Sequence, residues 1–516
     1  MTNPIAQVSS LSDTKDFIAI LSALTLLGSR DGPFTSEKLG QLIEADKYFR
    51  AMLSMEMHGY FDAQVDPVKK PESDMFAKHM QLVHSHFASA FQRYVMRKDS
   101  WLIGGDDELL LQQATALAIA NFGALVKWSY FLHETLKGTS WSELHALYYL
   151  AEQQGYHHQP LNVFGQGTLY NPSIQALYLR ALVLDIFNPG SLTAAQIEIA
   201  EAWLSAWCLD YALEMQYSSR SHLIYVDLAE HAGFHLVTPS VQGDTIRYLR
   251  ADALKAQIEE AKTELRLGRQ YTGLGSGIEF PVSEHVALLT TVERVYESIL
   301  AKSGNRIAER TQAENLTMEV MLGFDSVLNA AENLSGYKPR GFGRASGSPP
   351  PPQPAGDAES SGATARWKVH DYSSSGFGLL VDRATGECVP LQTLIALRTP
   401  GAPYWSLGSI VRKLTNRVQG QTLIGIEMLS FRPLPVRLNR AQGAEAVGPA
   451  TLQALYIAGK DAEGKRDFMV IRQSDFASRN LFEVAARGTH YRLRLNRAVK
   501  KGTDWIALRF EVDNKR

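Results

Sequence analysis

Cysteine is nearly absent from this sequence. Its 516 residues include only two cysteines, Cys208 and Cys388, which lie far apart along the chain. A disulfide-stapled secreted domain needs several cysteine pairs, and a cysteine zinc site needs closely spaced thiolates. Both classes are therefore excluded, so hydrophobic cores must hold the fold. A chain of this length is long enough for several domains.

An excess of charge of one sign is also missing. Lys and Arg total 52 and Asp and Glu total 54, which gives a formal net charge of −2. This balance argues against a globally basic nucleic-acid binder. Residues 431–516 are nevertheless basic, with 17 Lys or Arg against 9 Asp or Glu. Arg492, Arg494 and Arg497 alternate there with apolar residues. We interpret them as a solvated strand face and keep RNA binding as an alternative.

No long uninterrupted apolar run is present. Residues 1–16 are polar and acidic, whereas a signal peptide has a basic start followed by an apolar stretch. The longest apolar stretch, Leu109–Leu132, is interrupted by two glutamines, an asparagine and a lysine. This composition favours a buried helix over a membrane span. We therefore expect a cytoplasmic protein with no membrane span.

Helical periodicity dominates residues 1–302. Two capping patterns, Ser140–Glu143 and Thr193–Gln196, predict the starts of helices, because a hydroxyl can accept from a backbone amide three residues on. The apolar residues between Val286 and Ile299 recur at helical spacing and predict the last helix of this region. We predict one large all-α domain over residues 1–302.

Strand patterns replace the helical ones after residue 302. Residues 315–323 alternate and predict a strand, and residues 324–333 predict a short helix. Residues 341–364 contain four consecutive prolines among Gly, Ser and Ala, which predicts a disordered insertion. Short strands then follow one another to the end of the chain.

The fold class is therefore predicted as α+β. It comprises the helical region, an antiparallel β-barrel over residues 303–432 that carries the insertion, and a second small β module over residues 433–516. No internal repeat is convincing in the sequence.

One short motif at the end of a predicted strand suggests ligand binding. Asp371, Ser373 and Gly376 form the pattern Asp/Asn-x-Ser-x-x-Gly. A carboxylate can accept the paired N–H groups of a guanine edge, and a hydroxyl beside it can donate or accept. A glycine permits a tight turn and close approach of a ligand.

This motif and the strands after it resemble the PilZ domain, a bacterial receptor module for cyclic di-GMP. The segments Trp405–Arg412 and Ile424–Met428 are similar to the later strands of that barrel. The whole chain resembles a subgroup in which a long helical region precedes PilZ. The resemblance implies that Asp371, Ser373 and Gly376 contact cyclic di-GMP.

The PilZ family has a second motif, Arg-x-x-x-Arg, upstream of the barrel. Two arginines four residues apart can clamp phosphates and stack on guanine. Arg306 and Arg310 precede the first predicted strand and are our preferred pair. Arg340 and Arg344 lie nearer to Asp371 in sequence and remain an alternative, although a proline-rich segment follows them.

The resemblance implies a cyclic di-GMP effector without enzymatic activity. We expect no metal and no cofactor other than the nucleotide ligand, and the only expected macromolecular partner is an unidentified protein. The family suggests a role in motility, adhesion or biofilm control. Two alternatives stay open, namely a ligand-free PilZ-like scaffold for protein contacts and an RNA-binding regulator that uses the basic C-terminal module.

Overall fold

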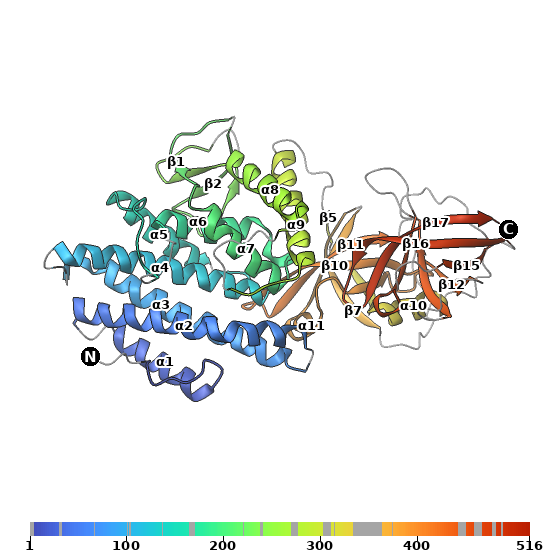
Figure 1. Ribbon diagram of the computed structural model, residues 1–516, viewed down its shortest axis with the longest axis horizontal. Helices are drawn as coiled ribbons and strands as arrows, with labels where there is room; N and C mark the ends of the chain where they lie inside the picture. Colours follow the sequence, from blue (N-terminus) through green and yellow to red (C-terminus); the bar gives the residue numbers. More distant parts are fainter. Residues whose placement is uncertain are drawn as a thin grey trace. The chain divides into compact units, whose positions relative to one another are not determined.

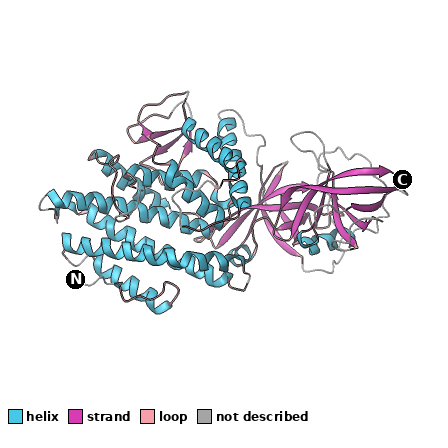
Figure 2. Ribbon diagram, in the orientation of Figure 1, coloured by secondary structure: helices cyan, strands magenta, loops and turns pink. Residues whose placement is uncertain are grey.

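The computed structural model divides the chain into two compact units, Met1–Arg306 and Ile307–Arg516. It describes residues 5–515 except 30–32, 67, 101, 103–104, 137, 165–170, 220, 238–240, 270–276, 303–310, 314, 334–363, 374, 442–449, 459–466, 477–480 and 487–488. Helices dominate the first unit and strands the second (Figure 2). The predicted α+β class is confirmed. The finer boundary expected at residue 432 stays a prediction, because both β modules belong to the second unit.

Nine α-helices lie among the described residues of the first unit (Figure 1). They are α1 (Thr14–Leu27), α2 (Ser36–Val65), α3 (Lys70–Met96), α4 (Gly105–Phe131), α5 (Gly138–Gln153), α6 (Ile174–Ile186), α7 (Ala194–Trp207), α8 (Ala251–Arg266) and α9 (Val282–Lys302). One large apolar core joins them.

The two predicted capping patterns have different outcomes. The Thr193 hydroxyl accepts from the Gln196 amide at 3.2 Å, and the Gln196 side chain accepts from the Thr193 amide at 3.1 Å. This capping box starts α7 as predicted. The prediction that Ser140 caps the start of a helix is wrong, because α5 already begins at Gly138. The Ser142 hydroxyl there donates back to the Gly138 carbonyl at 3.1 Å, as a serine inside a helix does.

A small antiparallel sheet interrupts the helical unit between α7 and α8, which the all-α prediction for this region did not include. Its strands run in the order β1-β4-β2-β3. They are β1 (Leu213–Glu214), β2 (His222–Asp227), β3 (His235–Leu236) and β4 (Ile246–Arg250). Burial alternates along β2, with every second side chain buried. Strand β2 has only six residues, so its alternation is a weak signal beside the long helical patterns around it.

Helix α4 is long and apolar enough, among the described residues, to cross a membrane by length and composition. Of its apolar window, 56% is buried inside the unit. Leu117, Ile119 and Phe122 are each at most 2% exposed and belong to the common core. Such burial is typical of a core helix packed on its neighbours.

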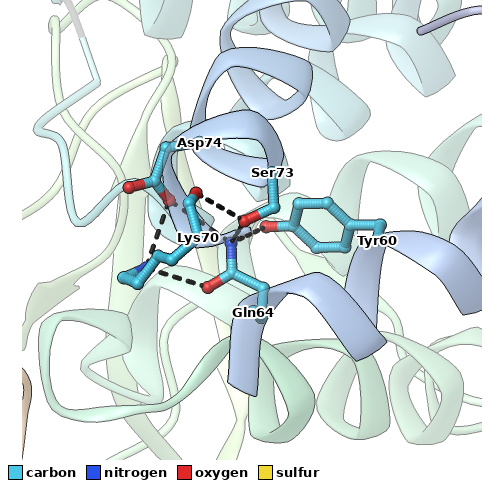
Figure 3. A network of polar contacts seen from close by, with 5 residues as sticks. All are labelled: Tyr60, Gln64, Lys70, Ser73 and Asp74. Carbon is cyan, nitrogen blue, oxygen red and sulfur yellow. Dashed lines mark hydrogen bonds and ion pairs between the residues drawn. The ribbon is translucent and has the colours of Figure 1, made fainter. Parts of the chain in front are cut away.

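A polar network joins the end of α2 to the start of α3 (Figure 3). The Gln64 amide donates to Tyr60 at 3.2 Å and to Ser73 at 2.9 Å, and its carbonyl accepts from Lys70 at 3.0 Å. Lys70 also forms an ion pair with Asp74 at 3.2 Å. Burial raises the pKa of Tyr60 well above its usual value, so its hydroxyl stays neutral. Because these groups satisfy one another, we interpret the network as structural.

The second unit begins with a sheet that closes into a ring. Its strand order is β5-β7-β6-β9-β10-β11-β8, and β7 also pairs with β8. The elements are β5 (Thr311–Gln312), β6 (Thr317–Leu322), α10 (Phe324–Asn333), β7 (Ala365–Ser373), β8 (Gly376–Asp382), α11 (Arg383–Cys388), β9 (Leu394–Arg398), β10 (Ser406–Asn416) and β11 (Gln421–Ser430). The predicted strand at 315–323 and helix at 324–333 are confirmed. The proline-rich segment 341–364 lies outside the described residues, apart from its last residue.

A second closed barrel follows, with the order β12-β13-β14-β17-β16-β15. Its elements are β12 (Leu434–Arg440), β13 (Thr451–Ile457), β14 (Phe468–Arg472), η3 (Gln473–Asp475), β15 (Leu481–Ala486), β16 (Thr489–Lys501) and β17 (Trp505–Lys515). If the six ring strands of each barrel are numbered one to six in chain order, both rings read one-two-three-six-five-four. The two barrels therefore share a topology, although the sequence showed no convincing repeat.

Helix α10 packs between the two barrels. Its apolar face shares a buried cluster with the outside of both, which includes Trp405 from the first barrel and Val470 and Trp505 from the second. The first amide of the helix, at Phe324, donates to the Asp504 carboxylate at 2.7 Å. Asp504 lies in the turn between β16 and β17, so the second barrel caps α10.

Candidate functional site

A bulge in β7 sets the direction of the Asp371 side chain. Register shifts between Val369, which pairs with Leu379, and Asp371, which pairs with Gly378. Leu379 belongs to the interior core of the first barrel, so by alternation Gly378 faces outward. A Cβ added to Gly378 would lie 2.5 Å from Asp371 Oδ1. The carboxylate therefore lies over Gly378 on the outer face.

Asp371 is held in a sheltered position on that face. It is 7% exposed, and Nδ1 of His370 lies 3.2 Å from its Oδ2. Its backbone pairs with Gln312 of β5 on one side and Gly378 of β8 on the other. A carboxylate fixed this way presents acceptor oxygens for a ligand's N–H groups.

Ser373 faces outward beside Asp371 at the end of the same strand. It pairs with Gly376 across the β7–β8 hairpin. Its hydroxyl accepts from the Ser375 amide at 3.3 Å and lies 3.2 Å from the Ser375 hydroxyl. These bonds shape the turn and keep the hydroxyl at the mouth of the hairpin.

Two buried glycines on this face let neighbouring groups approach the backbone closely. A Cβ on Gly376 would lie 2.2 Å from the Ile426 carbonyl oxygen of β11, so no larger residue fits without moving that strand. Gly378, as described, makes room for the Asp371 carboxylate. The predicted turn role of Gly376 thus gains a second reason, close approach of neighbouring strands.

Sequence reasoning missed Arg412 as a member of this face. Gly378 pairs with Gly425 of β11, and Gly425 pairs with Arg412 of β10. A row of paired residues therefore crosses four strands, with Asp371 at one end, Arg412 at the other and two glycines between them. With neighbouring strands about 4.8 Å apart, this row follows the curved sheet for roughly 14 Å. We call Asp371, Gly378, Gly425 and Arg412 the outer row.

The four candidate phosphate-clamping arginines cannot be placed. Arg306, Arg310, Arg340 and Arg344 all lie outside the described residues. The first described residue after Arg310 is Thr311, whose backbone pairs with Tyr372, the residue between Asp371 and Ser373. The Tyr372 ring stacks on Phe377 with centroids 6.4 Å apart.

Metal ligation finds no support in the part of the chain that is described. No group of three or more His, Cys, Asp or Glu side chains there could hold a metal ion. His79 stacks on Phe17 with ring centroids 3.9 Å apart, and His84 is buried with its Nδ1 2.7 Å from Asn121 Oδ1. Burial lowers the pKa of His84 to about 3, so its ring is neutral.

The helical unit contains a cavity of about 260 Å³. Its wall includes two nearly buried ion pairs, Lys127 with Glu198 at 3.1 Å and Arg180 with Glu201. Each charge has an opposite charge beside it, so the pairs account for one another without a ligand. Nothing in the sequence pointed to this cavity.

One known family matches part of the helical unit. Residues 20–216 match the model of a family described as "Cyclic-di-GMP receptor FimW, N-terminal domain". No curated protein matches the chain. The match covers well under half of the chain and none of the barrel residues. The match supports a relation to cyclic di-GMP receptors, as the resemblance implied. It does not include the first barrel, so it does not test the resemblance of that barrel to PilZ.

Proposed function

We propose that this protein is a non-enzymatic cyclic di-GMP effector of the PilZ type, which binds the nucleotide on the outer face of its first barrel. The outer row is the observation that carries the proposal. Asp371, whose carboxylate lies over Gly378, offers acceptors for a guanine edge, the half-buried Gly425 has no side chain that would keep a flat base from the backbone, and Arg412 supplies a cation for a phosphate. Ser373 and Gly376 complete the face at the hairpin.

The pairing of Thr311 with Tyr372 supports Arg306 and Arg310 as the clamp. Thr311, the residue paired with the motif strand, directly follows Arg310 in the sequence. Twenty residues separate Arg344 from the start of β7 in the sequence. We therefore retain the first pair in the proposal, with the second as the alternative.

The proposed output is a change in contacts with a protein partner. Residues 303–310 span the boundary between the two compact units. A clamp formed there on the nucleotide would favour one arrangement of the units over others, because the ligand binds only the arrangement that closes the clamp. The proposal places the protein in the cytoplasm, where it would meet the messenger, and in the control of motility, adhesion or biofilms.

Calorimetric titration of the full chain with cyclic di-GMP tests the proposal. We expect saturable binding that weakens at least tenfold in Asp371→Ala and in Arg310→Ala. The matched control is Arg383→Ala on α11, which pairs with Glu387 at 2.7 Å and should leave affinity unchanged. Absence of binding by the wild-type chain at micromolar concentrations rejects the function. Weakened binding in Arg344→Ala and not in Arg310→Ala moves the clamp to the alternative pair.

The observed contacts do not favour the RNA alternative. Arg494, in the middle of the basic strand β16, forms an ion pair with Asp513 at 3.0 Å. Part of the cationic face is thereby neutralised by its own barrel.

A further inference from the structure

The two barrels agree in more than strand order. In the first barrel Arg412 pairs with Gly425 and Lys413 with Ile424. In the second, Lys500 pairs with Ala507 and Lys501 with Ile506. In each barrel the fifth ring strand shifts register one residue before this basic pair, between Ile410 and Arg412 or between Ala498 and Lys500.

The local sequence and the connection agree as well. The bulged strands read Val-Arg-Lys at 411–413 and Val-Lys-Lys at 499–501. A short helical piece, α11 or η3, follows the third ring strand in both barrels. The two barrels thus share a bulge position, a basic pair and a helical connection. None of these three features follows from the ring order. Together they favour duplication of one barrel over a chance likeness of topology.

The register then gives the second barrel's counterpart of the outer row. Leu455 pairs with Val470, Val470 with Ala507, and Ala507 with Lys500. We call these four residues the counterpart row. Leu455 and Val470 are fully buried and Ala507 is 1% exposed. They belong to the cluster that holds α10, so apolar side chains stand where the first barrel has a carboxylate and two glycines.

The fourth residue of the counterpart row contacts the first barrel. Lys500, the counterpart of Arg412, forms an ion pair with Glu427 at 2.5 Å. Glu427 belongs to the first barrel and pairs in the sheet with Gly376. The Lys500 cation therefore binds the neighbouring barrel, and the other three residues of the counterpart row are buried, so a base cannot reach them.

We infer that residues 434–515 are a second copy of the first barrel in which the face equivalent to the nucleotide site has become a docking surface for α10 and the first barrel. Calling the first face the nucleotide site rests on the proposed function, whereas the duplication and the docking do not. The second copy supplies the Asp504 cap and the apolar floor under α10. It has no nucleotide site of its own.

Hydrogen exchange on the full chain tests the docking. Val470→Asp places a carboxylate in a dry cluster, and Asp504→Ala removes the cap while leaving the cluster intact. In both variants we expect the amides of α10 to exchange at least about tenfold faster, with β8 and β11 little changed. Asp513→Ala, which removes the ion pair between β17 and Arg494 of β16, is the control and should leave α10 protected.

Two outcomes overturn the docking. One is wild-type protection of α10 in both variants. The other is an equal loss of protection in β8, β11 and α10 when Asp504→Ala removes the cap. That result would mean that Asp504 supports the first barrel rather than the helix.

Cyclic di-GMP titration tests the loss of the second site. We expect the weakened binding of Asp371→Ala to stay the same when Lys500→Ala is added. Residual saturable binding in that variant, lost again on Lys500→Ala, assigns a site to the second barrel and overturns this part of the inference. If the wild-type chain binds no nucleotide, the proposed function fails, while the hydrogen-exchange result still decides the docking.

Discussion

The first barrel has glycines facing outward on its third and sixth ring strands, Gly378 under the Asp371 carboxylate and the half-buried Gly425, whereas the second barrel has Val470 and Ala507 at the same positions. The strand order and the bulge are shared, so the backbone fold does not account for the difference. The side chains on one outer face account for the covering of the second barrel by α10, and under the proposed function those of the first barrel bind the ligand. Both faces are outward-facing, and the apolar one is stable because α10 removes it from water.

Trp505→Ala should have the largest effect of the substitutions that test this comparison. The Trp505 ring is fully buried in the cluster under α10, and its Nε1 donates to the Gln392 carbonyl at 2.8 Å. We expect a loss of about 3–5 kcal/mol in the free energy of unfolding, measured by urea denaturation.

Leu423→Ala is the matched substitution in the first barrel, because Leu423 is the register counterpart of Trp505 and is only half-buried. Its expected cost is below about 2 kcal/mol. Equal costs for the two substitutions would contradict the view that one face is covered and the other open.

Gly378→Ala should have the next largest effect, on both the stability of the first barrel and its affinity for cyclic di-GMP. The new Cβ would lie 2.5 Å from Asp371 Oδ1, so the carboxylate must move. We expect a loss of about 1–3 kcal/mol of stability from overpacking and a cyclic di-GMP affinity reduced at least tenfold. Gly40→Ala in α2 is the control, since nothing lies within 4 Å of its added Cβ. It should stabilise the protein by roughly 0.5–1 kcal/mol, and unchanged affinity in Gly378→Ala would argue against Asp371 as a ligand contact.

Arg412→Met and Lys500→Met separate the roles of two register counterparts. We expect the first to weaken nucleotide binding about tenfold, or about 1.4 kcal/mol, since it removes a cation from the open face. The second should change binding less than threefold and should raise hydrogen exchange near Glu427, because that ion pair is lost. Titration calorimetry and hydrogen exchange give the two readouts. The reverse pattern would exchange the roles of the barrels.

Asp382→Ala should have the smallest effect. The Asp382 carboxylate caps α11 by accepting from the Thr385 amide at 2.9 Å and from its hydroxyl at 2.6 Å, whereas η3 at the equivalent place has no side-chain cap. The hydrogen bond from the Thr385 side chain, followed by that from its amide, lowers the pKa of Asp382. A lowered pKa in the folded state means that the capping contribution is present near neutral pH and is lost as the pH falls through that value. Thermal melts at pH 7 should show a modest decrease in Tm for the variant, and the difference from wild type should vanish in strong acid.

The sequence predicted the elements of this fold better than the faces of its strands. Alternation and turn residues located the strand at 315–323, the helix at 324–333 and most later strands, because these signals are local. Local alternation would place Asp371 on the same side as Val369, inside the barrel. The bulge between them reverses this, and it depends on how β7 pairs with β8.

Long-range pairing also explains why Arg412 and the duplication were missed. Arg412 joins the outer row through Gly425 and Gly378, which come from other strands. The two barrels also differ at these outward positions, where valine and alanine stand in the second barrel in place of the glycines of the first. The ring order and the shared bulge become visible only once the sheet is formed.

The cap on α10 has a consequence for biosynthesis. The capped amide of Phe324 precedes Asp504 by 180 residues. At about 5–20 residues per second, translation of that interval takes roughly 10–40 s. During this time α10 lacks both the Asp504 cap and the Trp505 side chain that packs against it. Its apolar face can then contact chaperones or other nascent chains. The last hairpin, β16–β17, is therefore needed before the apolar face of α10 can be fully buried.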